Sequence, residues 1–150
     1  MKVFCVDSGF LIGLYDETDQ YHEKANQYFS DFLSIGPNQL VIPWPTIYET
    51  VSTRMVRNRR RMETFERDWK RLRAQEKIAL LDDAPFRERA IEECFVELAK
   101  PARNYRMLSV TDRVLRNILS DVGVRIDVFI TFNPGDFLDV CRASRREMVS

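Results

Sequence analysis

The sequence contains few of the residues that build the commonest protein metal centres and nucleophilic sites. Among 150 residues there are three cysteines and one histidine. Cys5, Cys94 and Cys141 lie far apart, so no pair has the spacing of a structural zinc site. A catalytic triad would need His22, which lies in the polar run Asp-Gln-Tyr-His-Glu-Lys and is expected at a solvated helix position. We therefore expect reduced core cysteines and a cytoplasmic protein.

Long apolar runs are also missing. The segment from Met1 to Asp7 contains only a short apolar stretch, which an acid interrupts, so no signal peptide is expected. No stretch approaches the roughly 18 apolar residues of a membrane-spanning helix, so no membrane association is expected. The 45% of hydrophobic residues suffice for one core, and the length predicts a single domain over residues 1–150.

The charge of the chain is balanced overall but not along its length. Lys and Arg together number 23, as do Asp and Glu, so the formal net charge is zero. Residues 1–53 carry 2 basic and 7 acidic side chains, whereas residues 54–73 carry 9 basic and 3 acidic ones. The overall balance excludes a wholly basic nucleic-acid-binding protein, but the arginine-rich segment leaves room for a local contact with phosphates.

Short apolar segments alternate with longer amphipathic ones. Four segments are predicted to be buried strands, over residues 3–6, 40–42, 78–81 and 126–131. Helices are predicted over residues 9–15, 18–33, 44 to a break near 58, 58–75, 85–100, 109–122 with Gly123 as C-terminal cap, and from 133 onward. Strands separated by helices predict an α/β fold whose central parallel sheet is covered on both faces.

Acidic residues follow several of these strands or begin the helices after them. These positions are Asp7, Glu49, Asp112 and Asp136, with the amide Asn133 beside the last. In open parallel sheets, sites form at the edge where the carboxyl ends of the strands meet, so these side chains could converge there. Gathered carboxylates repel one another unless a divalent cation lies among them, and oxygen-only ligands favour Mg²⁺ or Mn²⁺. Such ions serve phosphoryl chemistry.

Each of these residues also has a structural interpretation. Asp7 is a favourable N-cap for the helix after it, and Glu49 could be an ordinary solvated helix residue. Asp112 fits a capping box that opens with the serine three positions before it. Asn133, followed by proline, fits an N-cap, with Asp136 as an acid in the first turn. The shared placement of these residues, rather than any one of them, favours a site.

Four short motifs at strand ends and helix starts follow one another along the chain. They are Asp7-Ser8-Gly9-Phe10-Leu11-Ile12, Pro45-Thr46-Ile47-Tyr48-Glu49, Val110-Thr111-Asp112 and Phe129-Ile130-Thr131-Phe132-Asn133-Pro134-Gly135-Asp136-Phe137. In this order and spacing they resemble the PIN-domain family, and within it the VapC-type toxins of toxin–antitoxin pairs. The resemblance runs from about residue 2 to 140. It implies a three-layer α/β/α sandwich and a metal-dependent endoribonuclease that hydrolyses RNA phosphodiester bonds.

The resemblance also implies roles for individual residues. Asp7, Glu49 and Asp112 would bind the metal ion, Mg²⁺ or Mn²⁺, and Thr131 is the hydroxyl that family members often place after the fourth strand. The family's fourth acid usually lies two residues beyond that threonine, where this chain has Asn133. Asp136 matches the second acid of the terminal motif and could substitute as a ligand. Whether one or two ions bind is left open.

The arginine-rich segment is the predicted RNA track. Its arginines are Arg54, Arg57, Arg59, Arg60 and Arg61. Guanidinium groups suit phosphate contacts because they donate two parallel hydrogen bonds. The alternative is a solvated helix face on which these arginines pair with Glu63, Glu66 and Asp68.

Kinship to the toxins implies a small antitoxin as partner and a homodimer. The aromatic helices at 21–32 and 65–69 are candidate contact surfaces, although core packing explains their aromatic residues equally well. Two alternatives stay open: a catalytically weakened module that binds RNA or a partner, which Asn133 favours, and a solitary PIN nuclease without an antitoxin.

Two other chemistries of acidic α/β folds are excluded. A haloacid-dehalogenase-type phosphatase needs a second aspartate at position 9, which is glycine. A response-regulator receiver needs a late lysine at a strand end, and the last lysine is Lys100.

Overall fold

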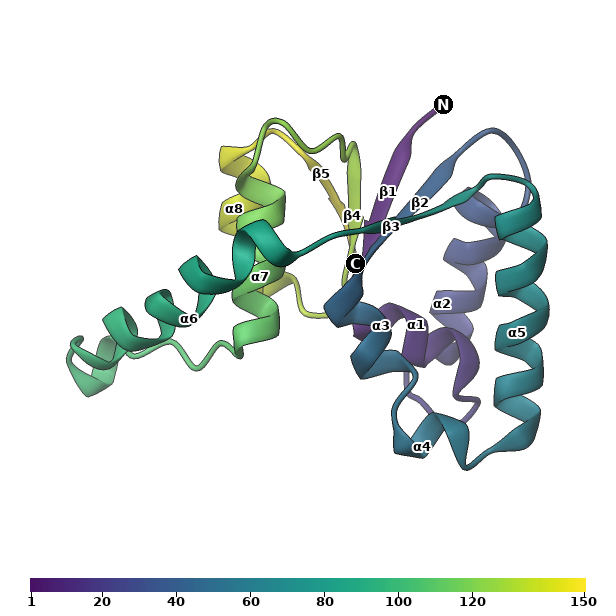
Figure 1. Cartoon of the computed structure of the whole chain (residues 1–150), viewed down its shortest axis with the longest axis horizontal. Helices are drawn as coiled ribbons and strands as arrows, with labels where there is room; N and C mark the ends of the chain where they lie inside the picture. The colour runs from purple at the N-terminus through teal and green to yellow at the C-terminus, as the bar shows by residue number, and fades with distance from the viewer.

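A computed structural model describes residues 1–150 and contains one central sheet of five parallel strands (Figure 1). The strands are β1 (Val3–Val6), β2 (Gln39–Pro43), β3 (Ile78–Leu81), β4 (Val128–Ile130) and β5 (Glu147–Val149). Their order in the sheet is β3-β2-β1-β4-β5. Strands β2 and β3 are added in turn on one side of β1, and β4 and β5 are added on the other side. The strand order therefore reverses between β1 and β4, which is where ligands bind in open parallel sheets.

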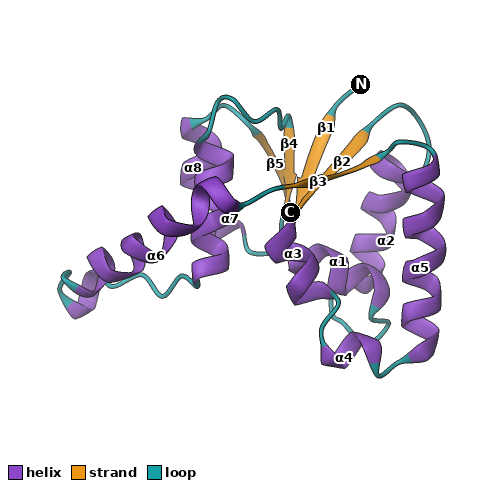
Figure 2. Cartoon of the chain, in the orientation of Figure 1, coloured by secondary structure: helices purple, strands orange, loops and turns teal.

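Helices connect the strands and cover both faces of the sheet (Figure 2). They are α1 (Ser8–Tyr15), α2 (His22–Tyr28), η1 (Phe29–Ser34), α3 (Trp44–Thr50), α4 (Thr53–Val56), α5 (Arg59–Ala74), α6 (Ala84–Leu98), η2 (Ala102–Asn104), α7 (Val110–Ser120), η3 (Pro134–Asp136) and α8 (Leu138–Ala143). In Figure 1, α1, α2 and α5 lie on one side of the sheet and α7 and α8 on the other, while α6 extends away from it. No helix is both long enough and apolar enough to cross a membrane.

Alternating side chains of the central strand β1 point into two separate apolar cores. Phe4 and Val6 belong to a core shared with α1, α2 and α5, whereas Cys5 between them belongs to a core shared with α7 and α8. All three side chains are buried. Because a strand directs successive side chains to opposite faces, helices on both sides are needed to bury them. The predicted three-layer α/β/α fold is confirmed.

The aromatic side chains at 21–32 and 65–69 pack within the chain. Tyr21 stacks on Phe132 with ring centroids 4.4 Å apart and planes at 10°. Phe65 meets Tyr15 edge-on, with centroids 5.2 Å apart. These aromatic residues line the first core, so core packing accounts for them without a partner chain.

The helix predicted over 18–33 begins later and ends differently. Its regular part starts at His22, because the preceding acids close turns of their own. The Asp16 side chain accepts a hydrogen bond from the amide of Thr18 at 2.9 Å, and Asp19 accepts one from the amide of Tyr21 at 2.8 Å. Such local bonds compete with the start of a helix. At its other end α2 widens into the π-helical turn η1.

Other boundaries also differ from the sequence prediction. The helix from Trp44 ends at Thr50, and a separate turn of helix, α4, precedes the expected break at Asn58. Helix α7 ends at Ser120, so Val122 lies outside its apolar stripe and is 92% exposed. Asp121, rather than Gly123, is the C-cap residue. The fourth strand is shorter than predicted, and the edge strand β5 was not predicted.

Candidate active site

Asp7 and Thr131 lie side by side at the point where the strand order reverses. Val6 and Ile130 are register partners in β1 and β4, and Asp7 and Thr131 are the residues that follow them. The Thr131 hydroxyl donates a hydrogen bond of 2.6 Å to Oδ2 of Asp7. The other oxygen, Oδ1, accepts a bond of 3.0 Å from the Phe10 amide, so Asp7 also caps α1 as its structural interpretation predicts.

Glu49 is brought to the same edge by α3. This helix starts directly after β2, and its side chains Thr46 and Thr50 are buried against the fold. Glu49 itself is exposed, and its Oε2 accepts a 2.6 Å hydrogen bond from the hydroxyl of Ser8. Ser8 follows Asp7 directly, so this bond connects α1 and α3 beside the buried carboxylate.

Asp112 and Asp136 come from the other side of the sheet. Asp112 lies in the first turn of α7, and its amide donates a 3.1 Å hydrogen bond to the side chain of the N-cap Ser109. Asp136 ends the short turn η3, which follows β4. Asn133 is exposed, and its backbone amide donates to Oγ1 of Thr131 at 3.0 Å.

Negative charges act on one another within the carboxylate site, which we define as Asp7, Glu49, Asp112 and Asp136. Burial raises the pKa of Asp7 from 3.8 to about 6, although its two hydrogen bonds oppose the rise. The negative charges of Asp112 and Glu49 add to it. Burial also raises the pKa of Asp112, and the charges of Asp136 and Glu49 act in the same direction. The fold therefore collects negative charge that an opposite charge would relieve.

The donor chemistry of the carboxylate site fits a hard divalent cation. Every side-chain donor in it is an oxygen, which is what Mg²⁺ and Mn²⁺ prefer. In the structure, however, no three His, Cys, Asp or Glu side chains are close enough together to form a coordination cluster. The charges of Glu49 and Asp112 thus act on Asp7, and those of Asp136 and Glu49 act on Asp112, but the four carboxylates do not form a closed coordination site. His22 takes no part in the site, since its Nδ1 lies 2.8 Å from the carbonyl of Gly13.

The arginines of the segment 54–61 have divided roles. Arg61 binds both acids at the end of α1, with Nη2 2.9 Å from Asp16 and 2.9 Å from Glu17. Arg54 lies 2.9 Å from Asp16 as well, and Arg59 pairs with a glutamate one turn along α5. Arg57 and Arg60 are exposed and form no ion pair. The helix α4 and the first turn of α5 lie beyond α1 and α3, on the side of the carboxyl ends of the strands (Figure 1).

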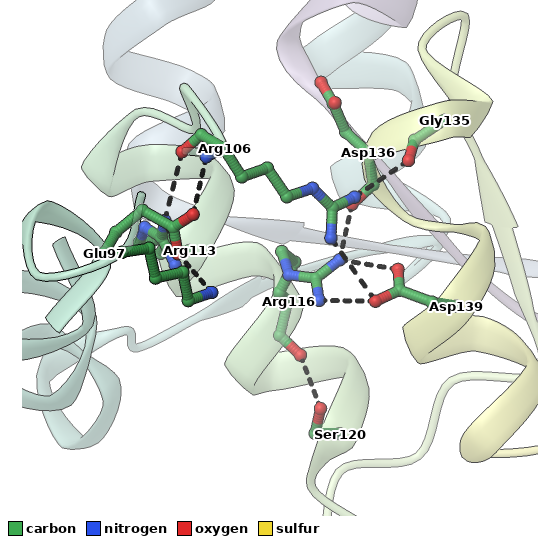
Figure 3. Close-up of polar contacts among 9 residues, drawn as sticks. Glu97, Arg106, Arg113, Arg116, Ser120, Gly135, Asp136 and Asp139 are labelled. Atoms are coloured by element: carbon green, nitrogen blue, oxygen red, sulfur yellow. Dashed lines mark hydrogen bonds and ion pairs between the residues drawn. The ribbon is translucent and has the colours of Figure 1, made fainter. Parts of the chain in front are cut away.

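Sequence reasoning missed several side chains that support the carboxylate site. Ser8 was part of a motif but had no role assigned to it. Arg106 and Arg116 reach across to the turn that carries Asp136, and Asp139 binds both of them (Figure 3). Their contacts join residues 20 or more positions apart, so no local pattern in the sequence could reveal them.

Comparisons with known proteins support the fold. The sequence matches no protein-family profile and no curated protein. Among solved structures, it is similar to VapC20 of Mycobacterium tuberculosis, a sarcin-ricin loop cleaving toxin, with a TM-score of 0.63, 18% identity and coverage of 91% of this chain and 94% of that one. It is also similar to VapBC2 from Rickettsia felis bound to a promoter DNA fragment, with a TM-score of 0.55, 8% identity and coverage of 98% and 97%. The chain therefore has the fold of VapC-type PIN toxins.

Proposed function

We propose that this chain, which has the fold of VapC-type PIN toxins, is a divalent-cation-dependent endoribonuclease. The observation that carries the proposal is that acidic side chains lie at the reversal of strand order, where burial and one another's charges raise the pKa values of Asp7 and Asp112. Negative charge concentrated where the fold places ligands is typical of a site that is completed by a cation. VapC20, a protein of the same fold, is a sarcin-ricin loop cleaving toxin.

Asp7, Glu49 and Asp112 would hold the ion, with Asp136 as a further oxygen donor. A bound Mg²⁺ or Mn²⁺ would lower the pKa of a water molecule and stabilise negative charge on the phosphate. Thr131 fixes the orientation of Asp7 through its 2.6 Å hydrogen bond, and Ser8 does the same for Glu49. Asn133 would orient a water molecule or an outer ligand through its exposed amide.

RNA would approach over α4 and the start of α5. Arg57 and Arg60 are suited to phosphate contacts because their guanidinium groups are exposed and free of protein carboxylates. Arg61 and Arg54 are engaged with Asp16 instead, so they shape this surface rather than supply free donors. Arg59, although paired with Glu63, is 93% exposed and can still meet the RNA backbone.

A defined panel of RNAs, incubated with the purified protein with and without Mn²⁺, tests the proposal. We expect cleavage that EDTA abolishes and that the substitution Asp112→Asn reduces at least 100-fold. Asp121→Asn is the matched control, because Asp121 lies at the opposite end of the same helix and its side chain only closes a turn onto Gly123. Equal cleavage by wild type and Asp112→Asn would contradict the proposal.

The principal rival is a binding module without catalysis, and Asn133 favours it. An amide replaces a carboxylate where the family resemblance predicts an acid, which weakens the attraction for a cation. The same panel separates the two functions, since a binding module would retain RNA without cutting it in Mn²⁺.

We also propose that a small antitoxin binds this chain and inhibits cleavage. The support is the fold shared with VapBC2, which was solved bound to a promoter DNA fragment, together with the resemblance of the sequence to the toxins of toxin–antitoxin pairs. Co-expression with the product of an adjacent short reading frame, followed by the RNA cleavage assay, tests this. Cleavage that persists in a purified complex would contradict inhibition, and the lack of any such complex would favour a solitary nuclease.

A further inference from the structure

The turn that carries Asp136 has little packing of its own. Asn133, Pro134 and Gly135 are all exposed, and no side chain caps η3. Gly135 has no neighbouring atom within 4 Å of the place where a side chain would begin. The buried ring of Phe137 anchors the end of the turn and the Asn133 amide hydrogen bonds to Thr131 at its start, but the side chains between these two anchors are not buried. Something else must fix the direction of the Asp136 side chain.

Arg116, one turn after Asp112 on α7, supplies the main support. Its Nη1 donates to the backbone carbonyl of Asp136 at 2.6 Å and to Oδ1 of Asp139 at 2.7 Å. Its Nη2 donates to Oδ2 of Asp139 at 2.7 Å, so the ion pair with Asp139 is bidentate. The Arg116 side chain is only 20% exposed, so its geometry is fixed by its surroundings.

Arg106 holds the same turn from the segment before α7. Its Nη2 donates to the carbonyl of Gly135 at 2.8 Å, and its Nη1 lies 3.4 Å from Asp139. The backbone of Arg106 is itself held, because its amide donates to Oε1 of the buried Glu97. Together the two guanidinium groups bind two consecutive carbonyls of the turn and the carboxylate that follows it (Figure 3).

The carboxylate of Asp136 takes no part in these contacts. In Figure 3 it points away from both guanidinium groups. No hydrogen bond joins it to either guanidinium group, and its negative charge acts on both Asp112 and Arg116. The arginines therefore bind the backbone of the turn at Gly135 and Asp136. They leave the carboxylate of Asp136 without a hydrogen bond, so that it is available to the carboxylate site.

We propose that Arg116 and Arg106 are positioning residues that hold Asp136 beside Asp112, so that Asp136 supplies the oxygen donor that Asn133 cannot. The inference rests on the proposed function, because the donor matters only if the carboxylate site binds a cation. A guanidinium fork is suited to this task because it is rigid and permanently charged. Lysine carries its donors on a single nitrogen and cannot reproduce the planar fork that spans the carbonyl and both carboxylate oxygens.

Mn²⁺ binding measured without RNA, by titration calorimetry or by the paramagnetic resonance of free Mn²⁺, tests the inference. We expect Arg116→Met and Arg106→Met each to weaken Mn²⁺ binding by about tenfold, as is usual when a residue that orients a metal ligand is lost. Cleavage by these variants should recover at saturating Mn²⁺, because the donors themselves remain. Arg116→Lys should resemble Arg116→Met despite keeping its charge.

A double-mutant cycle with Asp136→Asn separates positioning from general stability. If Arg116 acts through Asp136, adding Asp136→Asn to Arg116→Met should weaken Mn²⁺ binding little further. Additive losses would overturn the inference. Should Arg116→Met fail to fold, Asp139→Asn removes the same ion pair at a residue whose side chain is 56% exposed.

Arg146→Met is the matched control. Arg146 also binds backbone carbonyls, those of Leu119, Asp121, Val124 and Ile126, but at the opposite end of α7. Its loss should lower thermal stability and leave Mn²⁺ affinity unchanged. An Arg116→Met variant that binds Mn²⁺ as tightly as wild type, while wild type cleaves RNA, would overturn the inference alone. Wild type that binds Mn²⁺ but cuts no RNA would overturn only the proposed function, and absence of Mn²⁺ binding would overturn both.

Discussion

At the scale of single residues, the ionised carboxylate of Asp7 serves the proposed function but lowers the stability of the fold. It is 5% exposed, and burial raises its pKa from 3.8 to about 6. The native chain thus holds this proton more tightly than the unfolded chain does. The stability contributed by the protonated acid is present below pH 4 and is lost as the pH rises through about 6, a loss of about 3 kcal/mol.

Replacing the titrating group should therefore stabilise the metal-free fold. Asp7→Asn keeps an oxygen that can accept the hydrogen bond from the Phe10 amide. We expect the free energy of unfolding at pH 7.5 to rise by about 2 kcal/mol and its dependence on pH between 4 and 6 to weaken. Urea unfolding at several pH values in EDTA measures both, with Asp121→Asn as control. If the variant is less stable than wild type at pH 7.5, the buried, ionised carboxylate of Asp7 does not destabilise the fold as we expect.

Thr131 offers a second test at this scale. It is completely buried, and its hydroxyl hydrogen bonds to Asp7. Thr131→Val preserves the shape of the side chain but removes that bond, so Mn²⁺ affinity should fall 10- to 100-fold, whereas Thr131→Ser should keep most of it. Titration calorimetry at pH 7.5 compares the three proteins. Equal affinities for wild type and Thr131→Val would remove Thr131 from the proposed site.

At the scale of elements, the junction of α4 and α5 separates two kinds of arginine. Arg57 and Arg60 are free to contact phosphates, so their joint replacement by alanine should weaken RNA binding across sequences. Each lost contact with single-stranded RNA should flatten the plot of log affinity against log salt by about 0.7. Binding of Asp112→Asn to RNA at several salt concentrations measures the slope without cleavage. Arg125→Ala, near the amino end of β1, is the control, and an unchanged slope in the double variant would contradict the RNA track.

Arg61 should behave differently from its neighbours. Its side chain is 12% exposed and neutralises Asp16, which is 4% exposed. Arg61→Ala leaves Arg54 as the only cationic partner of that buried carboxylate, so we expect a loss of about 2 kcal/mol in the free energy of unfolding. Urea unfolding compares it with Arg60→Ala, which should be neutral. If Arg61→Ala unfolds like wild type, its ion pairs do not hold α1 to α5.

The elements that the sequence predicted well are those with a strong local pattern. Strand β1 and the strand β3 were predicted at their observed bounds, because each is a short apolar run ended by polar residues. The edge strand Glu147–Val149 was missed because it has three residues and is only partly buried, so it carries no apolar run. Its formation depends on pairing with β4, a contact that is distant in the sequence.

The sequence predicted part of the candidate site, because the order of the strands and helices determines which residues lie at the strand ends. Residues at strand ends converge in any parallel sheet, so the placement of Asp7 and Thr131 followed from the order of elements. The support for Asp136 did not, since Arg106 and Arg116 act on backbone carbonyls and any residue type presents a carbonyl. Whether the predicted ligands bind a metal ion stays a prediction.

At the scale of the whole molecule, the zero net charge is the sum of an acidic and a basic region. The fold brings parts of these two regions into contact. The acidic first third and the arginine-rich segment meet where Arg54 and Arg61 bind Asp16 and Glu17. The carboxylate site receives no such partner and keeps its negative charge. The fold thus neutralises acids that have only structural roles, and it leaves Arg57 and Arg60 exposed at the junction of α4 and α5, on the side of the sheet where the strands end.

The central claim is that this unneutralised site cuts RNA when a divalent cation binds. The most direct test is the single-turnover cleavage rate of one defined RNA measured against Mn²⁺ concentration, for wild type and Asp7→Asn. We predict no cleavage in EDTA, a rate that rises and saturates with Mn²⁺, and a rate at least 100-fold lower for Asp7→Asn although that variant is the more stable fold. Cleavage in EDTA, or equal rates for the two proteins, would contradict the claim.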